Sequence, residues 1–232
     1  METSSIIKVE KLVKRFPMGK GEFTALNGIE LELKRGEFAG LVGPSGSGKT
    51  TLLNIIGSLD VPTTGEAIVL GRSIGNLSAK EAARLRKESL GFIFQSYNLL
   101  AVHTVYENVE FPLLLLNFSS SERKKMVMDA LEWVGLTDKV KSKPPQLSGG
   151  ECQRVAIARA MVKKPLLVLA DEPTANLDAA NSHNILKTMA SLNNDLKTTF
   201  LFATHDDKVI SYLNRKIFLL DGQVDREEIK PN

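Results

Sequence analysis

The stretch Gly43-Pro44-Ser45-Gly46-Ser47-Gly48-Lys49-Thr50 decides the fold of this chain. Directly before it, Phe38 to Val42 is a short apolar run of the kind that forms a buried strand. Directly after it, apolar side chains recur at helical spacing from Leu52 to Ile56. The sequence therefore predicts a strand, a glycine-rich loop and a helix in this order, which is the building unit of an α/β domain.

The same eight residues match the P-loop pattern, and they stand between a strand and a helix, where that pattern has to stand. Glycines let consecutive backbone N–H groups turn inward around phosphate oxygens, and the start of the helix adds its positive end. We expect Lys49 to reach the terminal phosphates and Thr50 to offer its hydroxyl to Mg²⁺. A glycine-rich structural turn is the alternative. The candidate nucleotide-binding residues here are Gly43, Pro44, Ser45, Gly46, Ser47, Gly48, Lys49, Thr50 and Thr51.

Two carboxylates follow another apolar run, Leu166 to Ala170. If this run is a strand of the same sheet, Asp171 and Glu172 emerge at the edge where ligands bind in α/β proteins. Asp171 can then hold the Mg²⁺ shell, and Glu172 can polarise the water that attacks the terminal phosphate. By itself the pattern also fits a strand followed by a solvated turn.

Further strands are predicted by apolar runs at Leu90 to Phe94, Thr199 to Ala203 and Lys216 to Leu220, typical of a parallel sheet covered on both faces. The predicted fold is an α/β P-loop NTPase core with a mostly parallel sheet, a small antiparallel flank and an α-helical insert. The flank comprises three short segments, Ile6 to Val9, Phe23 to Leu26 and Ile29 to Leu33.

The insert contains a predicted helix in Ser119 to Val134, whose Ser119 and Glu122 have the spacing of a capping box. We therefore expect a single domain over residues 1–232. Its nucleotide-binding core, with the antiparallel flank, is residues 1–95 and 147–232, and its helical subdomain is residues 96–146.

Composition narrows the function classes. The chain has 232 residues, 43% of them hydrophobic, and a formal charge of +3 with no basic stripe, so nucleic acid is not an expected partner. Cys152 is the only cysteine, which fits a reducing compartment. The N-terminal residues 1–5 show no leader pattern, and the leucine run Leu113 to Leu116 is too short to span a bilayer. Any role at a membrane would therefore depend on a partner.

A second helix start that could bind phosphate is predicted at Leu147-Ser148-Gly149-Gly150-Glu151, ahead of a stretch in which apolar residues recur at helical spacing. One nucleotide hardly needs two such starts from the same chain. The stretch resembles the signature motif of the ATP-binding-cassette (ABC) family, and Gln153 and Arg154 extend the match. The resemblance implies that two copies of the chain enclose two ATP molecules, with Ser148, Gly149 and Gly150 of one copy closing over the γ-phosphate held by the other.

Other positions acquire roles from the same resemblance, which spans essentially the whole chain. Gln95 resembles the glutamine that contacts Mg²⁺ and water, and His205 resembles the histidine that contacts the γ-phosphate and orients Glu172. Asp178 resembles the aspartate that crosses the dimer interface. Phe16 matches the aromatic residue that stacks on adenine, although a core or edge phenylalanine is a serious alternative. The implied catalytic set is Glu172, His205, Lys49 and Gln95, and the implied Mg²⁺ set is Thr50, Gln95 and Asp171.

Within that family the chain resembles the branch of lipoprotein-releasing, macrolide-exporting and cell-division ATPases, the LolD/MacB/FtsE group. This resemblance implies an ATPase that drives integral membrane subunits from the cytoplasmic face of the membrane, in export or lipoprotein release. It would contact them through the surface of Tyr97, Leu99, Leu100 and Val102. An ATP-driven regulator of an extracytoplasmic enzyme, with nothing transported, is the alternative. The stretches that carry this resemblance are Phe23 to Leu26, Leu53 to Gly57, Gly91 to Gln95 and Glu107 to Val109.

Overall fold

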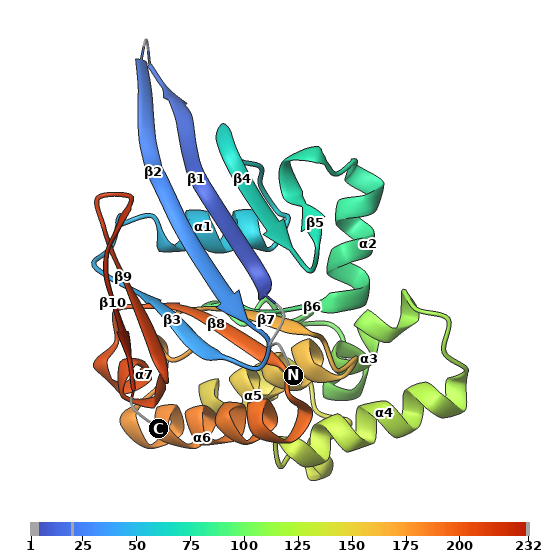
Figure 1. Cartoon of the computed structure of the whole chain (residues 1–232). Helices are drawn as coiled ribbons and strands as arrows, with labels where there is room; N and C mark the ends of the chain where they lie inside the picture. The colour runs from blue at the N-terminus through green and yellow to red at the C-terminus, as the bar shows by residue number, and fades with distance from the viewer. Residues whose placement is uncertain (1–4, 20, 231–232) are drawn as a thin grey trace.

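Two sheets with a helix between them form the frame of the structure (Figure 1). The computed structural model describes residues 5–19 and 21–230; residues 1–4, which belong to the stretch examined for a leader, lie outside this part. The larger sheet is parallel except for the antiparallel pair β9–β10 at one edge. Its strands in spatial order are β10 (Gln223–Ile229), β9 (Arg215–Leu220), β3 (Phe38–Val42), β8 (Thr199–Thr204), β7 (Leu167–Asp171) and β6 (Leu90–Ile93).

The strands predicted for this sheet are confirmed. The central strands β3, β7 and β8 are buried on both faces, whereas β9, nearer the edge, is buried mainly on one face. Strand β8 illustrates burial on both faces. Phe200 and Phe202 pack into the core on one side of the sheet, and Leu201 and Ala203 pack into the core on the other. Alternate side chains of a strand point to opposite faces, so an uninterrupted apolar run suits a sheet with a core on each side.

The antiparallel flank is a separate four-stranded sheet, larger than expected. The segments expected as two strands, Phe23 to Leu26 and Ile29 to Leu33, belong to one continuous strand. Gly28 has a φ of 73°, a conformation that glycine tolerates, and so the chain continues through it without leaving the sheet. The strands in spatial order are β2 (Gly21–Lys34), β1 (Ser5–Met18), β4 (Thr64–Val69) and β5 (Arg72–Ser73).

Helix α1 (Lys49–Ile56) lies between the two sheets (Figure 1). Its side chains Leu52, Leu53, Ile55 and Ile56 share one core with buried residues of both sheets. Because apolar neighbours enclose α1, the loop that precedes it is fixed at the edge of the larger sheet.

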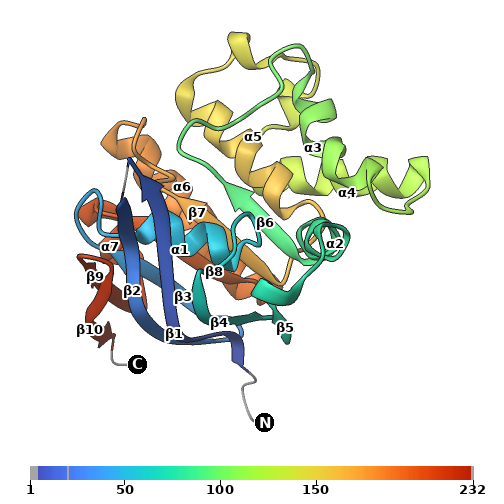
Figure 2. The ribbon, with the colours of Figure 1, turned by 90° about the horizontal axis from the view of Figure 1, so that it is seen from above.

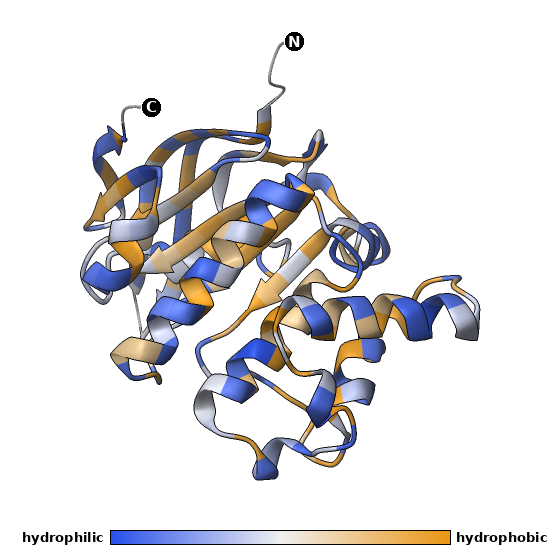
Figure 3. Ribbon diagram, turned by 90° about the horizontal axis from the view of Figure 1, so that it is seen from below, coloured by the Kyte–Doolittle hydropathy of each residue, from blue (hydrophilic) through white to orange (hydrophobic). Residues whose placement is uncertain are grey.

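Helices α5 and α6 cover the other face of the larger sheet, and α3 and α4 pack against α5, whereas α2 packs on the side of α1 through Leu85. Figure 3 shows hydrophobic strands beneath helices of mixed hydropathy. In Figure 2, α3 and α4 lie at the side of the molecule away from β1 and β2. The predicted helix in Ser119 to Val134 is confirmed with its capping box, as Ser119 caps α4. The helices are α2 (Ala79–Ser89), α3 (Val105–Leu114), α4 (Ser120–Trp133), α5 (Gly149–Met161), α6 (Ala179–Leu196) and α7 (Asp207–Tyr212), with 3-10 turns η1 (Ile74–Asn76), η2 (Thr137–Lys139) and η3 (Pro144–Gln146).

Candidate functional site

The loop between β3 and α1 leaves the start of α1 open. Gly46 and Gly48 have φ values of 82° and 97°, which an L side chain rarely adopts. Gly48 is the N-cap of α1, and no side chain of the described residues caps the helix there. The first backbone N–H groups of a helix have no partner within the helix, so this start can receive an anion.

Lys49 is buried in that loop and folds back over it. Its ammonium donates hydrogen bonds to the carbonyl oxygens of Gly43 and Pro44, at 2.7 and 2.8 Å. Burial lowers the pKa of Lys49, and the nearby carboxylates of Glu172 and Asp171 oppose this shift. A desolvated cation held beside unpaired helix N–H groups makes the loop attractive to phosphate.

Asp171 ends strand β7 and meets the second residue of α1. The hydroxyl of Thr50 donates to Asp171 Oδ1 at 3.2 Å. Burial raises the pKa of Asp171, the charge of Glu172 adds to the rise, and the hydrogen bond from Thr50 opposes it. A hydroxyl and a carboxylate are oxygen ligands of the type that Mg²⁺ binds, usually together with phosphate oxygens and water. This donor set fits Mg²⁺, although within residues 5–19 and 21–230 no group of three or more His, Cys, Asp and Glu side chains could hold a metal by itself.

Glu172 follows in a left-handed conformation with a φ of 44°, which costs a non-glycine residue on the order of 1–3 kcal/mol. Its backbone N–H donates to Ala203 O at 2.9 Å. Its Oε1 lies 2.6 Å from His205 Nδ1, and its Oε2 accepts a hydrogen bond from Thr204 Oγ1 at 3.1 Å. Both oxygens of the carboxylate are therefore held in place.

Thr204 is a positioning residue that the sequence did not reveal. Its hydroxyl is buried at the end of β8, where it donates to Glu172 and accepts a hydrogen bond from the backbone N–H of Asp206 at 3.0 Å. The only available signal was its place directly before His205, at the end of an apolar run.

These groups open into one pocket of about 410 Å³. It brings together predicted residues from four separate segments of the chain, since the ends of β7 and β8 meet the loop before α1 at one edge of the sheet. The predicted residues that line it are Ser45, Gly46, Gly48, Lys49, Thr50, Thr51, Gln95, Asp171, Glu172 and His205. Gly43, Pro44 and Ser47 belong to the same loop but are not part of the lining, and neither are Phe16, Ser148, Gly149, Gly150 and Asp178.

Phe16, expected to stack on adenine, lies next to the pocket and not in its lining. It pairs with Phe23 across β1 and β2, and Phe23, together with Ala25, does line the pocket. The ammonium of Lys14 lies 4.9 Å from the centre of the Phe16 ring. The assignment of Phe16 stays a prediction, and Phe23 is a second aromatic candidate on the same side of the hairpin.

The remaining predicted residues form a second cluster at the starts of α5 and α6. Ser148 caps α5, accepting from the backbone N–H of Glu151 at 3.3 Å, and Asp178 caps α6, accepting from that of Asn181 at 2.8 Å. A Cβ added to Gly150 would lie 2.7 Å from Asn181 Oδ1, so the two helix starts pack closely. The structure thus divides the predicted residues between a pocket and a separate cluster.

Cys152 lies one turn into α5 and is buried. Its thiol donates to Pro144 O at 3.6 Å, and burial raises its pKa. A thiol that stays protonated and covered is a poor nucleophile.

Comparisons with known proteins agree with this arrangement. The family model described as "ABC transporter" matches residues 26–175. The lipoprotein-releasing system ATP-binding protein LolD of Pseudoalteromonas translucida is 44% identical over 223 residues, covering 96% of each chain. An uncharacterized ABC transporter ATP-binding protein of Methanocaldococcus jannaschii, MJ0796, is 41% identical over 227 residues, covering 96% of this chain and 97% of the other.

Solved structures match equally well. A dimeric, post-hydrolysis structure of the ATP-binding cassette MJ0796 bound to ADP and phosphate superposes with a TM-score of 0.90 at 40% identity, covering 97% of this chain and 99% of the other. A structure of cbiO1 from Clostridium perfringens, part of an ABC transporter complex, superposes with a TM-score of 0.87 at 31% identity, covering 97% and 88%.

Proposed function

Because the chain belongs to the ABC transporter family, as an ATP-binding subunit that hydrolyses ATP, we propose that two copies of it enclose two Mg-ATP molecules and drive an integral membrane partner. One observation carries the proposal. The glycine-rich start of α5, which could bind phosphate, contributes no residue to the pocket of its own chain within residues 5–19 and 21–230. A second copy would bring that start to the pocket, and the related cassette is dimeric in its solved structure.

In the proposed site each residue acts through a contact described above. Lys49 and the open N–H groups of α1 bind the phosphates, and Ser148, Gly149 and Gly150 of the second copy close over the γ-phosphate. Thr50, Asp171 and Gln95 would hold Mg²⁺, whose charge helps to neutralise the phosphate oxygens when it is bound.

Hydrolysis is assigned to Glu172. Its carboxylate orients the attacking water and accepts its proton, while the hydrogen bonds from Thr204 and with His205 keep it aimed into the pocket. Asp178 of each copy is placed at the interface between the copies. Residues 96–146 are assigned to a helical subdomain, and the rest of the chain to the nucleotide-binding core.

The membrane partner is inferred from the relatives of the chain. Within residues 5–19 and 21–230, no helix combines the length and the apolar character needed to cross a membrane. Relatives that cover nearly the whole chain are named as subunits of a lipoprotein-releasing system. We therefore assign this chain to lipoprotein release or a related export, acting at the cytoplasmic face of the membrane through its partner.

The Glu172→Gln variant tests the assignment of the base. Without a carboxylate to accept the proton, ATP turnover should fall by roughly 10²–10⁴-fold, while the contacts that bind nucleotide remain. With Mg-ATP the variant should elute as a stable dimer in size-exclusion chromatography with light scattering. Glu132→Gln, on the exposed side of α4, is the matched control and should keep the normal rate. Normal turnover in Glu172→Gln would show that another group is the base.

The membrane partner is tested by capture. Tagged Glu172→Gln protein with Mg-ATP is incubated with detergent-solubilised membranes of the native host, and bound proteins are identified by mass spectrometry. Recovery of an integral membrane protein with a large extracytoplasmic domain is the expected result. Recovery of soluble proteins alone would contradict the membrane role and leave the ATPase assignment intact.

A further inference from the structure

A ring of hydrogen bonds leads from the side chain of Glu172 back to its own loop. Thr174 Oγ1 donates to Asp206 Oδ2 at 3.0 Å. The backbone N–H of Asp206 donates to Thr204 Oγ1 at 3.0 Å, and Thr204 Oγ1 donates to Glu172 Oε2 at 3.1 Å. Only Pro173 separates Thr174 from Glu172 in the chain, so the ring closes through the backbone. It ties the loop after β7 to the loop after β8.

The ring determines where the single proton of the Thr204 hydroxyl points. A hydroxyl donates one hydrogen bond and offers two lone pairs to donors. The backbone N–H of Asp206 occupies the acceptor side of Oγ1, which leaves the proton for Glu172 Oε2. Thr204 is fully buried, so solvent does not replace either bond. The hydrogen bond to Glu172 therefore depends on the position of the Asp206 backbone.

Asp206 is held in position by both oxygens of its carboxylate. Oδ1 accepts a hydrogen bond from the backbone N–H of Lys208 at 2.9 Å, because Asp206 is the N-cap of α7. Oδ2 accepts the hydrogen bond from Thr174, and the ammonium of Lys208 lies 4.0 Å from the same oxygen. Without the Thr174 hydroxyl, the carboxylate would be free to turn toward Lys208, and the backbone N–H of Asp206 would move with it.

The backbone of Glu172 needs such support. Its φ of 44° is a conformation that a non-glycine residue keeps only where the surrounding contacts over-determine it. The backbone N–H of Ala175 donates to Glu172 O at 3.2 Å, and that of Leu177 donates to Thr174 O at 3.0 Å. Thr174 is thus fixed to its own loop by its backbone and to the loop after β8 by its side chain.

We propose that Thr174 and Asp206 are positioning residues for ATP hydrolysis, whose mutual hydrogen bond keeps the carboxylate of Glu172 aimed at the attacking water through Thr204. This inference rests on the role of Glu172 in the proposed function, and it adds the residues that hold Glu172 in place. Neither Thr174 nor Asp206 is among the residues that line the pocket. Their loss should therefore lower the rate of the hydrolysis step and leave the binding of ATP unchanged.

Thr174→Val removes the hydroxyl and keeps the shape of the side chain. We expect kcat for ATP hydrolysis by the free chain to fall roughly tenfold, because a small displacement of a catalytic group is costly. The effect is partial because His205 still holds the other oxygen of Glu172. The KM for ATP should change by less than about twofold. Thr174→Ser restores the hydroxyl and should recover most of the lost kcat.

Asp206→Ser breaks the same hydrogen bond from its other side. Serine still provides an N-cap for α7 but has no second oxygen for Thr174. This variant should lower kcat in the same way as Thr174→Val, again with little change in KM. It keeps the test decisive if Thr174→Val does not fold.

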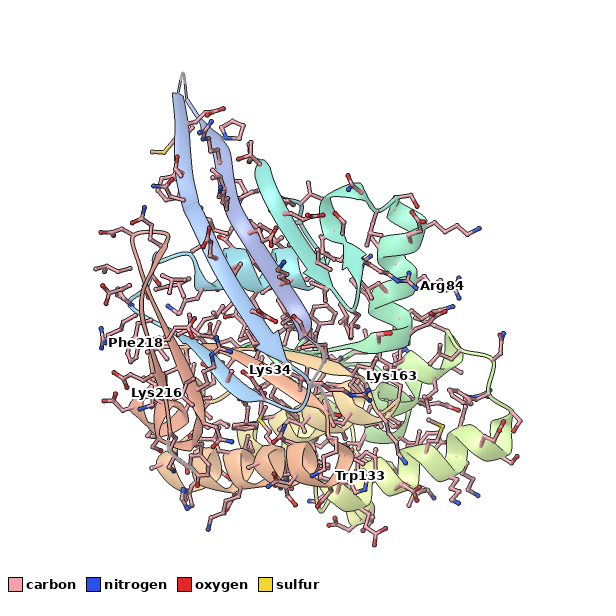
Figure 4. All side chains as sticks on the ribbon, viewed as in Figure 1. Lys34, Arg84, Trp133, Lys163, Lys216 and Phe218 are labelled. Atoms are coloured by element: carbon pink, nitrogen blue, oxygen red, sulfur yellow. The ribbon has the colours of Figure 1, made fainter. Side chains whose placement is uncertain are left out.

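Thr198→Val is the matched control for the loss of a buried hydroxyl. Thr198 and Thr174 are both 2% exposed, and Thr198 Oγ1 donates to Pro165 O at 2.9 Å. Thr198 directly precedes β8, at the end of that strand away from the pocket and near the end of β2, where Figure 4 labels Lys34. Urea unfolding should show comparable losses of stability in the two valine variants, whereas only Thr174→Val should lower kcat.

A double variant tests whether Thr174 acts through Thr204. Thr204→Val removes the hydrogen bond to Glu172 directly and should lower kcat at least as much as Thr174→Val does. Adding Thr174→Val to Thr204→Val should then lower kcat further by less than about twofold, because both changes break one chain of contacts. Losses that multiply in full would show that Thr174 acts by another route and would overturn the inference.

Three other results would also overturn it, namely unchanged kcat in both Thr174→Val and Asp206→Ser, a kcat in Thr174→Ser as low as in Thr174→Val, or an equal loss of kcat in Thr198→Val. Each of them leaves the proposed function in place, because the role of Glu172 is tested separately by Glu172→Gln. Normal turnover in Glu172→Gln would instead count against the proposed base itself.

Discussion

Helices α1 and α5 both begin at glycine-rich turns, yet the two starts are built differently. Gly48 precedes α1 in a left-handed conformation, and no side chain of the described residues caps the helix. Ser148 precedes α5 in an extended conformation and forms a complete capping box with Glu151. The start of α1 also has Lys49, Asp171 and Glu172 around it, whereas the start of α5 contributes nothing to that pocket.

The difference indicates that the two helix starts have different roles in the proposed dimer. A helix start whose N–H groups are left open, with a lysine beside it, binds phosphate within one chain. A helix start that caps itself is stable without a ligand, so in the proposed dimer it can stay on the surface until a second copy binds. Each start can be changed separately by mutation.

The largest expected effect separates ATP binding by a single chain from closure of the proposed dimer. Lys49→Met should weaken ATP binding by the single chain and also abolish turnover. Ser148→Arg places a bulky side chain at the start of α5, so turnover should fall roughly 10²-fold while ATP affinity of the single chain changes by less than about twofold. Binding of a fluorescent ATP analogue and phosphate release measure the two quantities. Loss of binding in Ser148→Arg would show that α5 serves the pocket of its own chain.

The next effect concerns the two glycines. Gly48→Ala puts a Cβ at 2.7 Å from Ala25 O and retains a φ of 97°, so the free energy of unfolding should fall by about 1–3 kcal/mol. Gly149→Ala has no positive φ to maintain, and its Cβ would lie 3.1 Å from the hydroxyl of Tyr97, so the change should stay within about 0.5 kcal/mol. Urea unfolding of both variants measures this. Equal losses of unfolding free energy in the two variants would mean that stability does not depend on the left-handed turn before α1.

The smallest effect is a pH dependence of stability at the start of α5. The hydrogen bond from the backbone N–H of Ser148 lowers the pKa of Glu151 below its ordinary value. A carboxylate with a lowered pKa in the folded state stabilises the fold above the pKa of the unfolded chain, and this contribution disappears as the pH falls through the folded-state value. Glu151→Gln should therefore be less stable than the unchanged chain at pH 7 and nearly equal to it at pH 3, measured by urea unfolding.

Glu122→Gln in α4 is the control for that measurement. Glu122 forms the same capping box, and the side-chain hydrogen bond from Ser119 lowers its pKa in the same way. It should lose a similar amount of stability at pH 7, but ATP turnover should not change. A loss at pH 3 as large as at pH 7 in Glu151→Gln would show that packing, and not the charge, explains the effect.

The sequence predicted those parts of the site that follow from where strands end. Thr50 and Asp171 are 121 residues apart and form a hydrogen bond, as expected from a loop and a strand end at one edge of a sheet. The central strands β3, β7 and β8 were predictable because both of their faces are buried, which leaves an uninterrupted apolar run in the sequence.

Other features depend on contacts that no local pattern reveals. Helix α2 was not predicted because only Leu85 is buried, so apolar periodicity is missing, although Ser78 and Glu81 carry a capping-box pattern. Phe23 lines the pocket because the long β1–β2 hairpin pairs it with Phe16, and that register is set by several bulges.

Helix α5 also links two distant parts of the molecule as a stiff rod. Its 13 residues form a rod of roughly 20 Å. One end carries Ser148, and the other is fixed by Arg159 to the carbonyl groups that follow Gln95 and by Lys163 to the end of α2. Because α5 is one continuous helix, a shift of α2 at its far end would also move the start that carries Ser148.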